Sequence, residues 1–308
     1  MNILIRADSS SHIGTGHIMR DLVLAKQFPL DNIDFATLNL AGNINYKITE
    51  SDFKINILKT SDFDELNNLI NKLEINMIII DHYGIDYDFE KKLKKLNPNL
   101  KILVLDDTYE RHYCDILLNH NISADEKKYK KLVPKNCQLM CGSKYTLLRD
   151  EFLQAEKTSR KIKKNNKFKT IFIAIGGADH SNINIKILDV IKLIPNLKVN
   201  IVSTKANKNL TKLRKYCKSK PWINLQINSN EIAKIMLKSD FVIVTPSVTV
   251  NEAYFLKLPI ITIKTANNQI DIFNYLKKNR YLVIDKFNKI KLKIAINKLL
   301  KKKFNGKY

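Results

Sequence analysis

The sequence has no long apolar run. Within its 308 residues no stretch of 18 consecutive apolar residues occurs, and the first strand-like segment contains Arg6 and is followed at once by Asp8. A membrane-spanning helix needs about 20 such residues, and a signal peptide needs an uncharged apolar core. We therefore expect neither feature and predict a cytoplasmic protein.

Cysteine is scarce, and metal-binding patterns are lacking. The histidines do not form an H-E-x-x-H motif, and the two D-x-D triplets, at residues 62–64 and 86–88, each open a predicted helix, where aspartate is favoured as a cap. The cysteines form no C-x-x-C pair and no zinc spacing with histidine. We predict that the protein uses no metal and no cofactor. The cysteines are Cys114, Cys137, Cys141 and Cys217.

Acidic residues are scarce in the second half only. The net charge is +23, yet residues 1–150 contain 20 Lys and Arg against 21 Asp and Glu, whereas residues 151–308 contain 33 against 9. Such an excess suggests nucleic acid or an anionic membrane surface as a partner. The basic runs have almost no interleaved aromatic residues, so we expect no nucleic acid. An anionic nucleotide, or peripheral membrane contact through the basic half, remains open.

What the chain does have is an alternation of short apolar segments with helix-like stretches, which predicts parallel sheets with helices on both faces. The alternation stops in a lysine-rich, glycine-free connector and then restarts. We therefore predict two doubly wound Rossmann-like domains, residues 1–155 and 156–308, that face a cleft in a monomer. This architecture resembles the GT-B fold. The predicted strands are residues 3–7, 35–40, 55–58, 77–80, 102–105, 116–118, 170–175, 199–202, 223–227, 241–245, 260–263 and 281–284.

The first predicted strand runs into a turn with two glycines, Gly14 and Gly16, directly before His17. The apolar residues Ile18 and Leu22, four positions apart, place His17 in the first turn of a helix. Unpaired amides and the positive end of the helix dipole favour an anion there and disfavour a protonated imidazole. The turn fits two interpretations equally: an anion site beside a neutral histidine base, or a tight turn followed by a polar residue.

The same glycines do not complete a dinucleotide-binding fingerprint. Met19 stands where the G-x-G-x-x-G motif has its third glycine, and Asn39, near the end of the next predicted strand, stands where the motif expects an acidic residue. We therefore do not expect a nicotinamide or flavin cofactor.

The second half opens in the same way. A strand precedes Gly176 and Gly177, whose amides are predicted to bind a diphosphate, although such pairs also make simple turns. After a later strand, Ser247 and Thr249 stand at a helix start, and Glu252 follows. These hydroxyls suit phosphate, and the carboxylate suits a ribose. Alternatively, Ser247 caps the helix and Glu252 is its acidic partner. We favour nucleotide binding.

Polar residues also follow other predicted strands. These segments are residues 81–83 (Asp-His-Tyr), 106–108 (Asp-Asp-Thr) and 267–269 (Asn-Asn-Gln). Because ligands of such sheets bind beyond the carboxyl ends of the strands, we expect these side chains on the ligand side. Tyrosine and amide groups there can hydrogen-bond a sugar, although they are also ordinary loop residues. The carboxylates of Asp8 and Asp81 can support a histidine or bind substrate amides.

The opening segment, RADSSSHIGTGHIMRD at residues 6–21, resembles the UDP-sugar hydrolases of pseudaminic acid biosynthesis, a pathway of flagellin glycosylation. These enzymes release UDP and 2,4-diacetamido-2,4,6-trideoxy-L-altrose. The resemblance implies that His17 is the catalytic residue and that Tyr83 and Asn268 assist at the sugar. We add Gly14, Gly16, Asp8 and Gln269 to the predicted substrate site. The likeness continues through residues 81–83, 106–107, 176–177, 251–253 and 268–269.

The resemblance implies a mechanism that needs no metal. Neutral His17 is expected to activate a water that attacks the anomeric carbon with inversion, while the basic domain stabilises the departing diphosphate. A GT-B glycosyltransferase would use the same nucleotide half with a different acceptor. A basic nucleic-acid-binding protein is the alternative from another class. UDP release from the UDP-sugar alone distinguishes the hydrolase from both.

Overall fold

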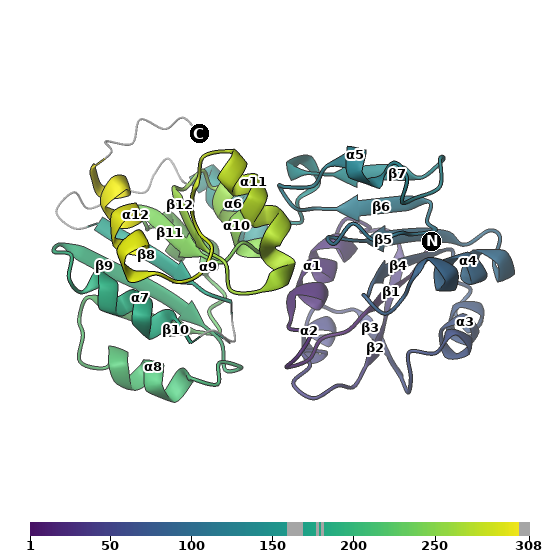
Figure 1. Cartoon of the computed structure of the whole chain (residues 1–308). Coiled ribbons are helices and arrows are strands. Elements are labelled where there is room, and N and C mark those ends of the chain that lie inside the picture. The colour runs from purple at the N-terminus through teal and green to yellow at the C-terminus, as the bar shows by residue number, and fades with distance from the viewer. Residues whose placement is uncertain (159–168, 177–178, 180–181, 302–308) are drawn as a thin grey trace. The chain divides into compact units, whose positions relative to one another are not determined.

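The structure is a computed structural model that describes residues 1–158, 169–176, 179 and 182–301. It divides into two compact units, Met1–Leu148 (unit 1) and Arg149–Tyr308 (unit 2), which Figure 1 shows in purple to teal and in teal to yellow. The predicted boundary at residue 155 falls inside helix α6 (Asp150–Thr158). This helix packs on α9 (Ile232–Leu237), and the Glu151 carboxylate accepts a hydrogen bond from the Ala233 amide at 3.0 Å. Helix α6 therefore belongs with unit 2.

Unit 1 contains a parallel sheet of seven strands in the order β3-β2-β1-β4-β5-β6-β7. The isoleucines 78–80 of β4 are at most 1% exposed, as is typical of strands covered on both faces. One core lies between the sheet and α1, and a second lies between the sheet and α3 and α4. The strands are β1 (Asn2–Ala7), β2 (Asn32–Leu38), β3 (Lys54–Leu58), β4 (Met77–Asp81), β5 (Lys101–Leu105), β6 (Ile116–Asn119) and β7 (Gln138–Cys141). The helices are α1 (Gly16–Ala25), α2 (Tyr46–Thr49), α3 (Phe63–Lys72), α4 (Tyr87–Leu96), α5 (Glu126–Tyr129) and the short η1 (Ser143–Tyr145).

Unit 2 contains a parallel sheet of six strands in the order β10-β9-β8-β11-β12-β13. Ile171 and Ile173 of β8 meet Ile187 of α7 and Leu292 of α12 in its core, and Trp222 packs against this core. The strands are β8 (Lys169–Ala174), β9 (Leu197–Ser203), β10 (Ile223–Ile227), β11 (Phe241–Val244), β12 (Ile260–Ile263) and β13 (Leu282–Ile284). The other helices are α7 (Asn184–Ile191), α8 (Leu210–Cys217), α10 (Val248–Phe255), η3 (Asn267–Gln269), α11 (Ile270–Lys278) and α12 (Lys289–Lys301).

Both sheets have the doubly wound topology that the sequence predicts. Each predicted strand is present, and the chain runs outward in both directions from the central strands β1 and β8. Strand β7 was not predicted, because its four residues pair only with β6 at the sheet edge and are intermediate or exposed. Such a strand lacks the continuous apolar run of a central one. The cleft between the domains stays a prediction.

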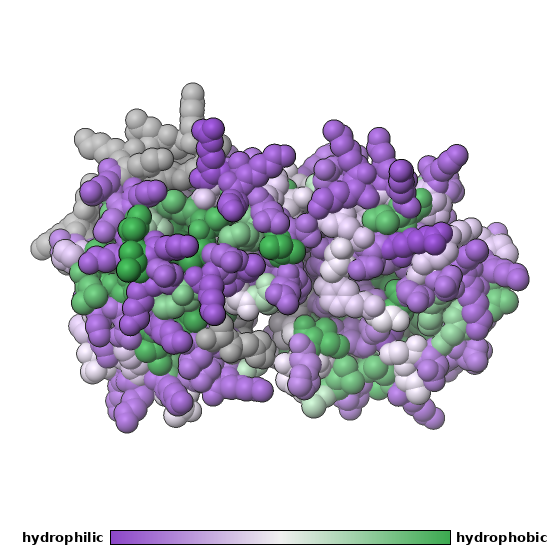
Figure 2. Space-filling model, viewed as in Figure 1, coloured by the Kyte–Doolittle hydropathy of each residue, from purple (hydrophilic) through white to green (hydrophobic). Residues whose placement is uncertain are grey.

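The described residues contain no helix that is both long enough and apolar enough to cross a membrane. In Figure 2, hydrophilic side chains cover much of the visible face of each unit, and the hydrophobic patches between them are small and scattered.

Candidate active site

The turn between β1 and α1 is closed by its own backbone. The Ser10 amide donates to the Gly14 carbonyl at 3.2 Å, and the Gly14 amide donates back to the Ser10 carbonyl at 2.8 Å. Gly14 has a φ of +90°, which favours glycine. A Cβ atom at Gly14 or Gly16 would meet no atom within 4 Å, and Thr15 makes no side-chain cap on α1. The turn therefore presents bare backbone and an uncapped helix start to open space.

His17 is held in the first turn of α1 by Asp81. The residue is 7% exposed, and its Nδ1 lies 2.7 Å from Oδ1 of Asp81, the last residue of β4. Strand register places Asp81 opposite Ala7 of β1, so both residues lie at the carboxyl edge of the sheet. Because an ionised carboxylate only accepts, Nδ1 carries the proton and the lone pair of the neutral ring lies on Nε2. Among the described residues, Nε2 has no hydrogen-bond partner.

Arg20, one turn after His17, holds the same carboxylate. Its Nε lies 2.6 Å from Asp81 Oδ2 and its Nη2 lies 2.5 Å from Oδ1, while Nη1 donates to Asp107 at 2.9 Å. Burial by itself would raise the pKa of Asp81, but the charge of Arg20 and the hydrogen bonds from Arg20 and His17 lower it well below its usual range. Asp81 is therefore ionised and fixes the orientation of the imidazole. Arg20 was not among the predicted site residues, although its spacing from His17 on a helix was visible.

Tyr83 stands beside the imidazole. Its ring meets that of His17 edge-on, with centroids 5.0 Å apart and planes at 88°, and its hydroxyl donates to Asp107 at 2.9 Å. Burial of the hydroxyl and the nearby charge of Asp107 raise the pKa of Tyr83 above its usual value, although the whole residue is 57% exposed. The phenol therefore stays protonated.

The loop that carries Tyr83 is fixed by His82. Its Nδ1 accepts from the Gly84 amide at 3.0 Å, so Nε2 carries the proton and lies 3.2 Å from Asp8. A Cβ atom at Gly84 would lie 2.8 Å from the His82 ring, which explains the glycine.

Asp8 acts within the protein, although the sequence suggested a substrate contact. Its Oδ1 accepts from the Leu38 amide at 2.7 Å and lies 2.8 Å from the Arg6 guanidinium, and its Oδ2 accepts from Arg6 at 2.9 Å and faces His82. Burial would raise its pKa, but His82 and Arg6 lower it well below its usual range. Because both of its carboxylate oxygens have partners within the protein, Asp8 links β1, β2 and the loop after β4.

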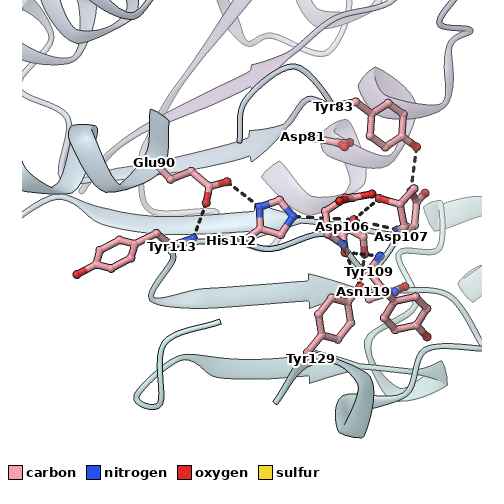
Figure 3. A network of polar contacts seen from close by, with 12 residues as sticks. Asp81, Tyr83, Glu90, Asp106, Asp107, Tyr109, His112, Tyr113, Asn119 and Tyr129 are labelled. Carbon is pink, nitrogen blue, oxygen red and sulfur yellow. Dashed lines mark hydrogen bonds and ion pairs between the residues drawn. The ribbon is translucent and has the colours of Figure 1, made fainter. Parts of the chain in front are cut away.

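A buried network anchors the segment that carries Asp107 (Figure 3). His112 Nδ1 lies 2.7 Å from Glu90, and its Nε2 lies 4.0 Å from Asp106. Burial would lower the pKa of His112, but the nearby carboxylates of Asp106 and Glu90 raise it to about 9. Asp106 also accepts from the Tyr129 hydroxyl at 2.7 Å. Asp106 therefore points into the protein, while its neighbour Asp107 points to Tyr83 and Arg20.

In unit 2, the first amides of α7 are bound by the side chain of Asp179. Asp179, 2% exposed, accepts from the amides of Ile183 at 3.1 Å and Asn184 at 3.3 Å. Gly176 has a φ of +63° and open space at its Cβ position, whereas Gly177 lies outside the described residues. A diphosphate at this turn would therefore share the helix start with a carboxylate, which the sequence did not indicate.

The start of α10, unlike that of α7, has no side chain bound to its first amides. Ser247 is the N-cap residue but makes no side-chain cap, so the capping interpretation is wrong; its hydroxyl lies 3.1 Å from that of Thr245 instead. Glu252 is 5% exposed, and its Oε1 accepts from Arg149 Nε and Nη2 at 3.1 and 2.8 Å. Burial raises the pKa of Glu252, and Arg149 offsets part of the rise. Thr249 lies in the first turn of the same helix.

The segment after β12 is closed by Gln269, whose side-chain oxygen accepts from the amides of Thr265 at 2.8 Å and Ala266 at 3.3 Å. This contact turns the Gln269 amide inward and leaves Asn268 exposed. Beside the segment lies a cavity of about 480 Å³. Residues from α7, from this segment and from the end of β13 line it, among them Lys186, Lys264, Asn267, Asp285, Lys286 and Phe287.

Within the described part of the chain, no group of three or more histidine, cysteine or acidic side chains could hold a metal ion.

Comparison with solved structures defines the fold class. MurG of Acinetobacter baumannii matches with a TM-score of 0.67 at 11% identity, over 97% of this chain and 90% of that one. A UDP-GlcNAc 2-epimerase from Neisseria meningitidis, bound to UDP-GlcNAc, matches with a TM-score of 0.60 at 12% identity, over 97% and 91%. The two parallel-sheet units thus have the fold of GT-B glycosyltransferases and related proteins, as predicted.

Sequence comparison shows the family. A scan against models of known protein families finds no match. The chain is 40% identical over 288 residues to UDP-2,4-diacetamido-2,4,6-trideoxy-beta-L-altropyranose hydrolase of Campylobacter jejuni, covering 93% of this chain and 100% of that protein. It is also 22% identical over 277 residues to the spore coat polysaccharide biosynthesis protein SpsG of Bacillus subtilis, covering 87% and 79%. The chain is an enzyme that belongs to the family of the Campylobacter hydrolase, which confirms the predicted resemblance.

Proposed function

We propose that the protein hydrolyses UDP-2,4-diacetamido-2,4,6-trideoxy-beta-L-altropyranose to UDP and the free sugar, with His17 as the general base. The observation that carries the proposal is the held imidazole: Nδ1 is fixed on Asp81 at 2.7 Å, and Nε2 has no partner among the described residues. At the neighbouring turn, a Cβ atom on Gly14 or Gly16 would meet no atom within 4 Å, so no side chain of the turn blocks the approach of a substrate to the imidazole. The 40% identity to a hydrolase of that substrate supports the choice of reaction.

The proposed step transfers one proton and exchanges one bond. A water gives a proton to His17 Nε2 while its oxygen bonds to the anomeric carbon, and the bond from that carbon to the UDP oxygen breaks on the opposite face, which inverts the configuration. The imidazolium that forms lies against ionised Asp81, which stabilises it. Tyr83, as a protonated phenol, and exposed Asn268 are suited to hydrogen-bond sugar substituents.

For the nucleotide we propose the start of α10 as the main diphosphate site. Ser247 and Thr249 offer hydroxyls beside uncapped amides, and they adjoin no carboxylate cap, in contrast to Asp179 at the start of α7. Glu252 keeps Oε2 for a ribose, because Arg149 takes only Oε1 among its described contacts. We also assign Gly176 to the nucleotide site. Gln269 contributes indirectly, because its side chain holds the segment that contains Asn268. A cytoplasmic monomer without a cofactor remains our expectation.

The fold also favours a second candidate, a glycosyltransferase with a UDP-sugar donor, because MurG shares the architecture. The two candidates differ only in the acceptor. UDP release by the purified protein from the UDP-sugar alone supports the hydrolase, and release only after an acceptor is added supports the transferase. In ¹⁸O water, label in the sugar supports attack at the anomeric carbon, whereas label in UDP would mean attack at phosphorus.

The general-base role is tested by His17→Leu. We expect turnover to fall by about 10²- to 10⁴-fold with UDP affinity unchanged. His12→Leu, an exposed histidine of the same turn, is the matched control and is expected to retain turnover within about tenfold. Survival of His17→Leu activity within that same range would rule out this role.

A further inference from the structure

Helix α12 has apolar side chains on two opposite faces. Its inner face is buried in the core of unit 2, where the helix lies beside α7 (Figure 1). On its outer face, Ile290 is 72% exposed and Ile294 is 51% exposed, although the outer face of a helix in a globular protein is normally polar. These two isoleucines lie one turn apart and form a single apolar strip, which core packing does not explain. The buried residues of the inner face are Leu292, Ala295, Ile296 and Leu299.

Lysines border this apolar strip on both sides. A helix turns by about 100° per residue, so Lys293 falls on one side of the strip, and Lys291 and Lys298 fall on the other. Residues 289–301 contain five lysines and no acidic residue. The long side chains of such lysines can extend their charged ends away from an apolar surface while their carbon stems lie along it. The outer face of α12 is therefore an apolar strip inside a basic frame.

The acidic residues of the adjoining segments do not neutralise this frame. On α7, the Asp189 carboxylate accepts from Lys192 at 3.0 Å and from the Tyr216 hydroxyl at 2.8 Å. In the connection from β13 to α12, Asp285 lies 2.6 Å from Lys264. Both carboxylates thus have cationic partners outside α12, and the helix keeps its excess of positive charge.

We propose that α12 is a membrane-docking helix that lies flat on an anionic lipid surface. Ile290 and Ile294 insert at the boundary of headgroups and acyl chains, and the surrounding lysines contact the anionic headgroups. An amphipathic helix of this kind binds by buried apolar area together with attraction to anionic lipid, so one partner accounts for both the strip and its frame. This inference concerns a surface of unit 2 and does not rest on the proposed function.

Other partners fit the outer face of α12 less well. A second copy of the chain packed through the same face would bring two sets of lysines together without acidic residues between them, which is unfavourable. Single-stranded nucleic acid is bound by aromatic side chains placed among basic ones, and the outer face has isoleucines in that place. An anionic bilayer offers negative charge and apolar depth at the same site.

The docking is tested by sedimentation of the full chain with lipid vesicles. At about 50 mM salt, we expect vesicles with about 30% phosphatidylserine in phosphatidylcholine to bind the protein at least about tenfold more strongly than vesicles of phosphatidylcholine alone. Binding is expected to weaken as the salt concentration is raised, because screening shortens the range of the attraction. Equal binding to both kinds of vesicle, or no binding to the anionic ones, would overturn the proposal.

Insertion of the apolar strip is tested by the double substitution Ile290→Ser and Ile294→Ser. We expect it to weaken binding to the anionic vesicles by at least about tenfold, because two side chains no longer bury apolar surface. Leu30→Ser with Leu96→Ser, at two exposed leucines of unit 1, is the matched control and is expected to change binding by less than about twofold. Unchanged binding of the isoleucine variant would overturn the proposal.

The basic frame is tested by Lys293→Glu with Lys298→Glu. We expect binding to weaken by at least about 25-fold, because each lysine near an anionic surface contributes about fivefold. Lys91→Glu with Lys95→Glu, at exposed lysines of α4, changes the net charge equally and is the matched control. Equal losses in both variants would show that the total charge of the protein, and not this helix, drives binding, and would overturn the proposal.

Two further measurements complete the test. Fluorescence of Trp222 is expected to be the same in wild type and in all four variants, since each changes only exposed side chains. Sedimentation equilibrium without lipid is expected to give the same mass for wild type and for the isoleucine variant. A dimer that the isoleucine substitutions dissociate would show that a second copy covers the strip, and would overturn the proposal.

Discussion

Helices α1 and α7 follow the central strands β1 and β8, so their N-termini occupy the same place in the topology of the two units. The two N-termini differ in whether a side chain binds their first amides. After β1, α1 begins behind Gly14 and Gly16 with no side-chain cap and no acidic residue in its first turn. After β8, α7 begins behind Gly176 with its first amides bound to the carboxylate of Asp179. Equivalent glycine turns are therefore open in unit 1 and internally satisfied in unit 2.

A glycine turn after a central strand is therefore an anion site only if the protein leaves its amides free. In unit 1 the open turn adjoins an imidazole fixed by buried charges, which is suited to chemistry. In unit 2 the start of α10, three strand–helix connections later, has no side-chain cap and is suited to binding. The proposed division of labour, with bond breaking in unit 1 and nucleotide binding in unit 2, follows from this contrast.

The largest expected effect is that of Asp81→Asn, which tests the proposed catalytic role of unit 1. Asp81→Asn removes the charge that orients His17, so we expect kcat to fall by about 10²- to 10⁴-fold while the Kd for UDP stays unchanged. Steady-state kinetics and calorimetric titration with UDP measure the two quantities. Asp88→Asn, an exposed aspartate on α4, is the matched control. A parallel loss of UDP affinity in Asp81→Asn would contradict the division between units.

The second prediction concerns pH, because buried His112, whose pKa is strongly raised, lies in unit 1. The folded pKa of His112 is about 9 against an ordinary value of 6.5, so its contribution to stability is fully present below pH 6.5 and is lost as pH rises through 9. We expect unit 1 to lose about 2 to 3 kcal/mol of unfolding free energy across that window.

Hydrogen exchange of unit 1 peptides measures this loss, while fluorescence of Trp222, the single tryptophan, follows unit 2. His112→Gln is expected to flatten the pH dependence of unit 1. An equal pH dependence in that variant would mean that another group is responsible.

The third prediction tests the proposed nucleotide site of unit 2. The double substitution Ser247→Val and Thr249→Val removes two hydroxyls at the start of α10, and we expect UDP to bind about 10- to 100-fold more weakly, as hydrogen bonds to charged groups are worth about 1.5 to 3 kcal/mol. The Kd for uridine, which has no phosphate, is expected to change little. Equal losses for UDP and uridine would place the diphosphate elsewhere.

The smallest expected effect concerns Asp179. Asp179→Ala removes the cap of α7 and is expected to destabilise the protein by about 1 kcal/mol, as loss of a helix cap usually does. If the diphosphate lies at α10, UDP affinity stays within about twofold, since the variant removes no group that binds the diphosphate there. Thermal unfolding and UDP titration measure both. A large gain in UDP affinity would show that the carboxylate had been competing with a diphosphate at α7.

Much of the fold was visible in the sequence, because buried parallel strands are continuous apolar runs and twelve of them could be located along the chain. Strand β7 was missed because an edge strand need be neither long nor fully apolar. In the site, His17 and Tyr83 were found from the turn and the strand end that carry them. Arg20 and Arg149 were missed, because their partners Asp81 and Glu252 lie 61 and 103 positions away.

The sequence by itself determined that two doubly wound domains are present, where each central turn lies and which residue types stand there, because periodicity and turn chemistry are local properties of the chain. Only the tertiary structure decided which polar groups are left free. Asp8 and Gln269 are occupied by internal donors, Asp179 closes one helix start, Ser247 leaves another open, and Asp81 fixes the tautomer of His17. Hydrogen-bond partners are assigned by packing segments that are far apart in the chain, so this distinction between occupied and available groups is created by folding.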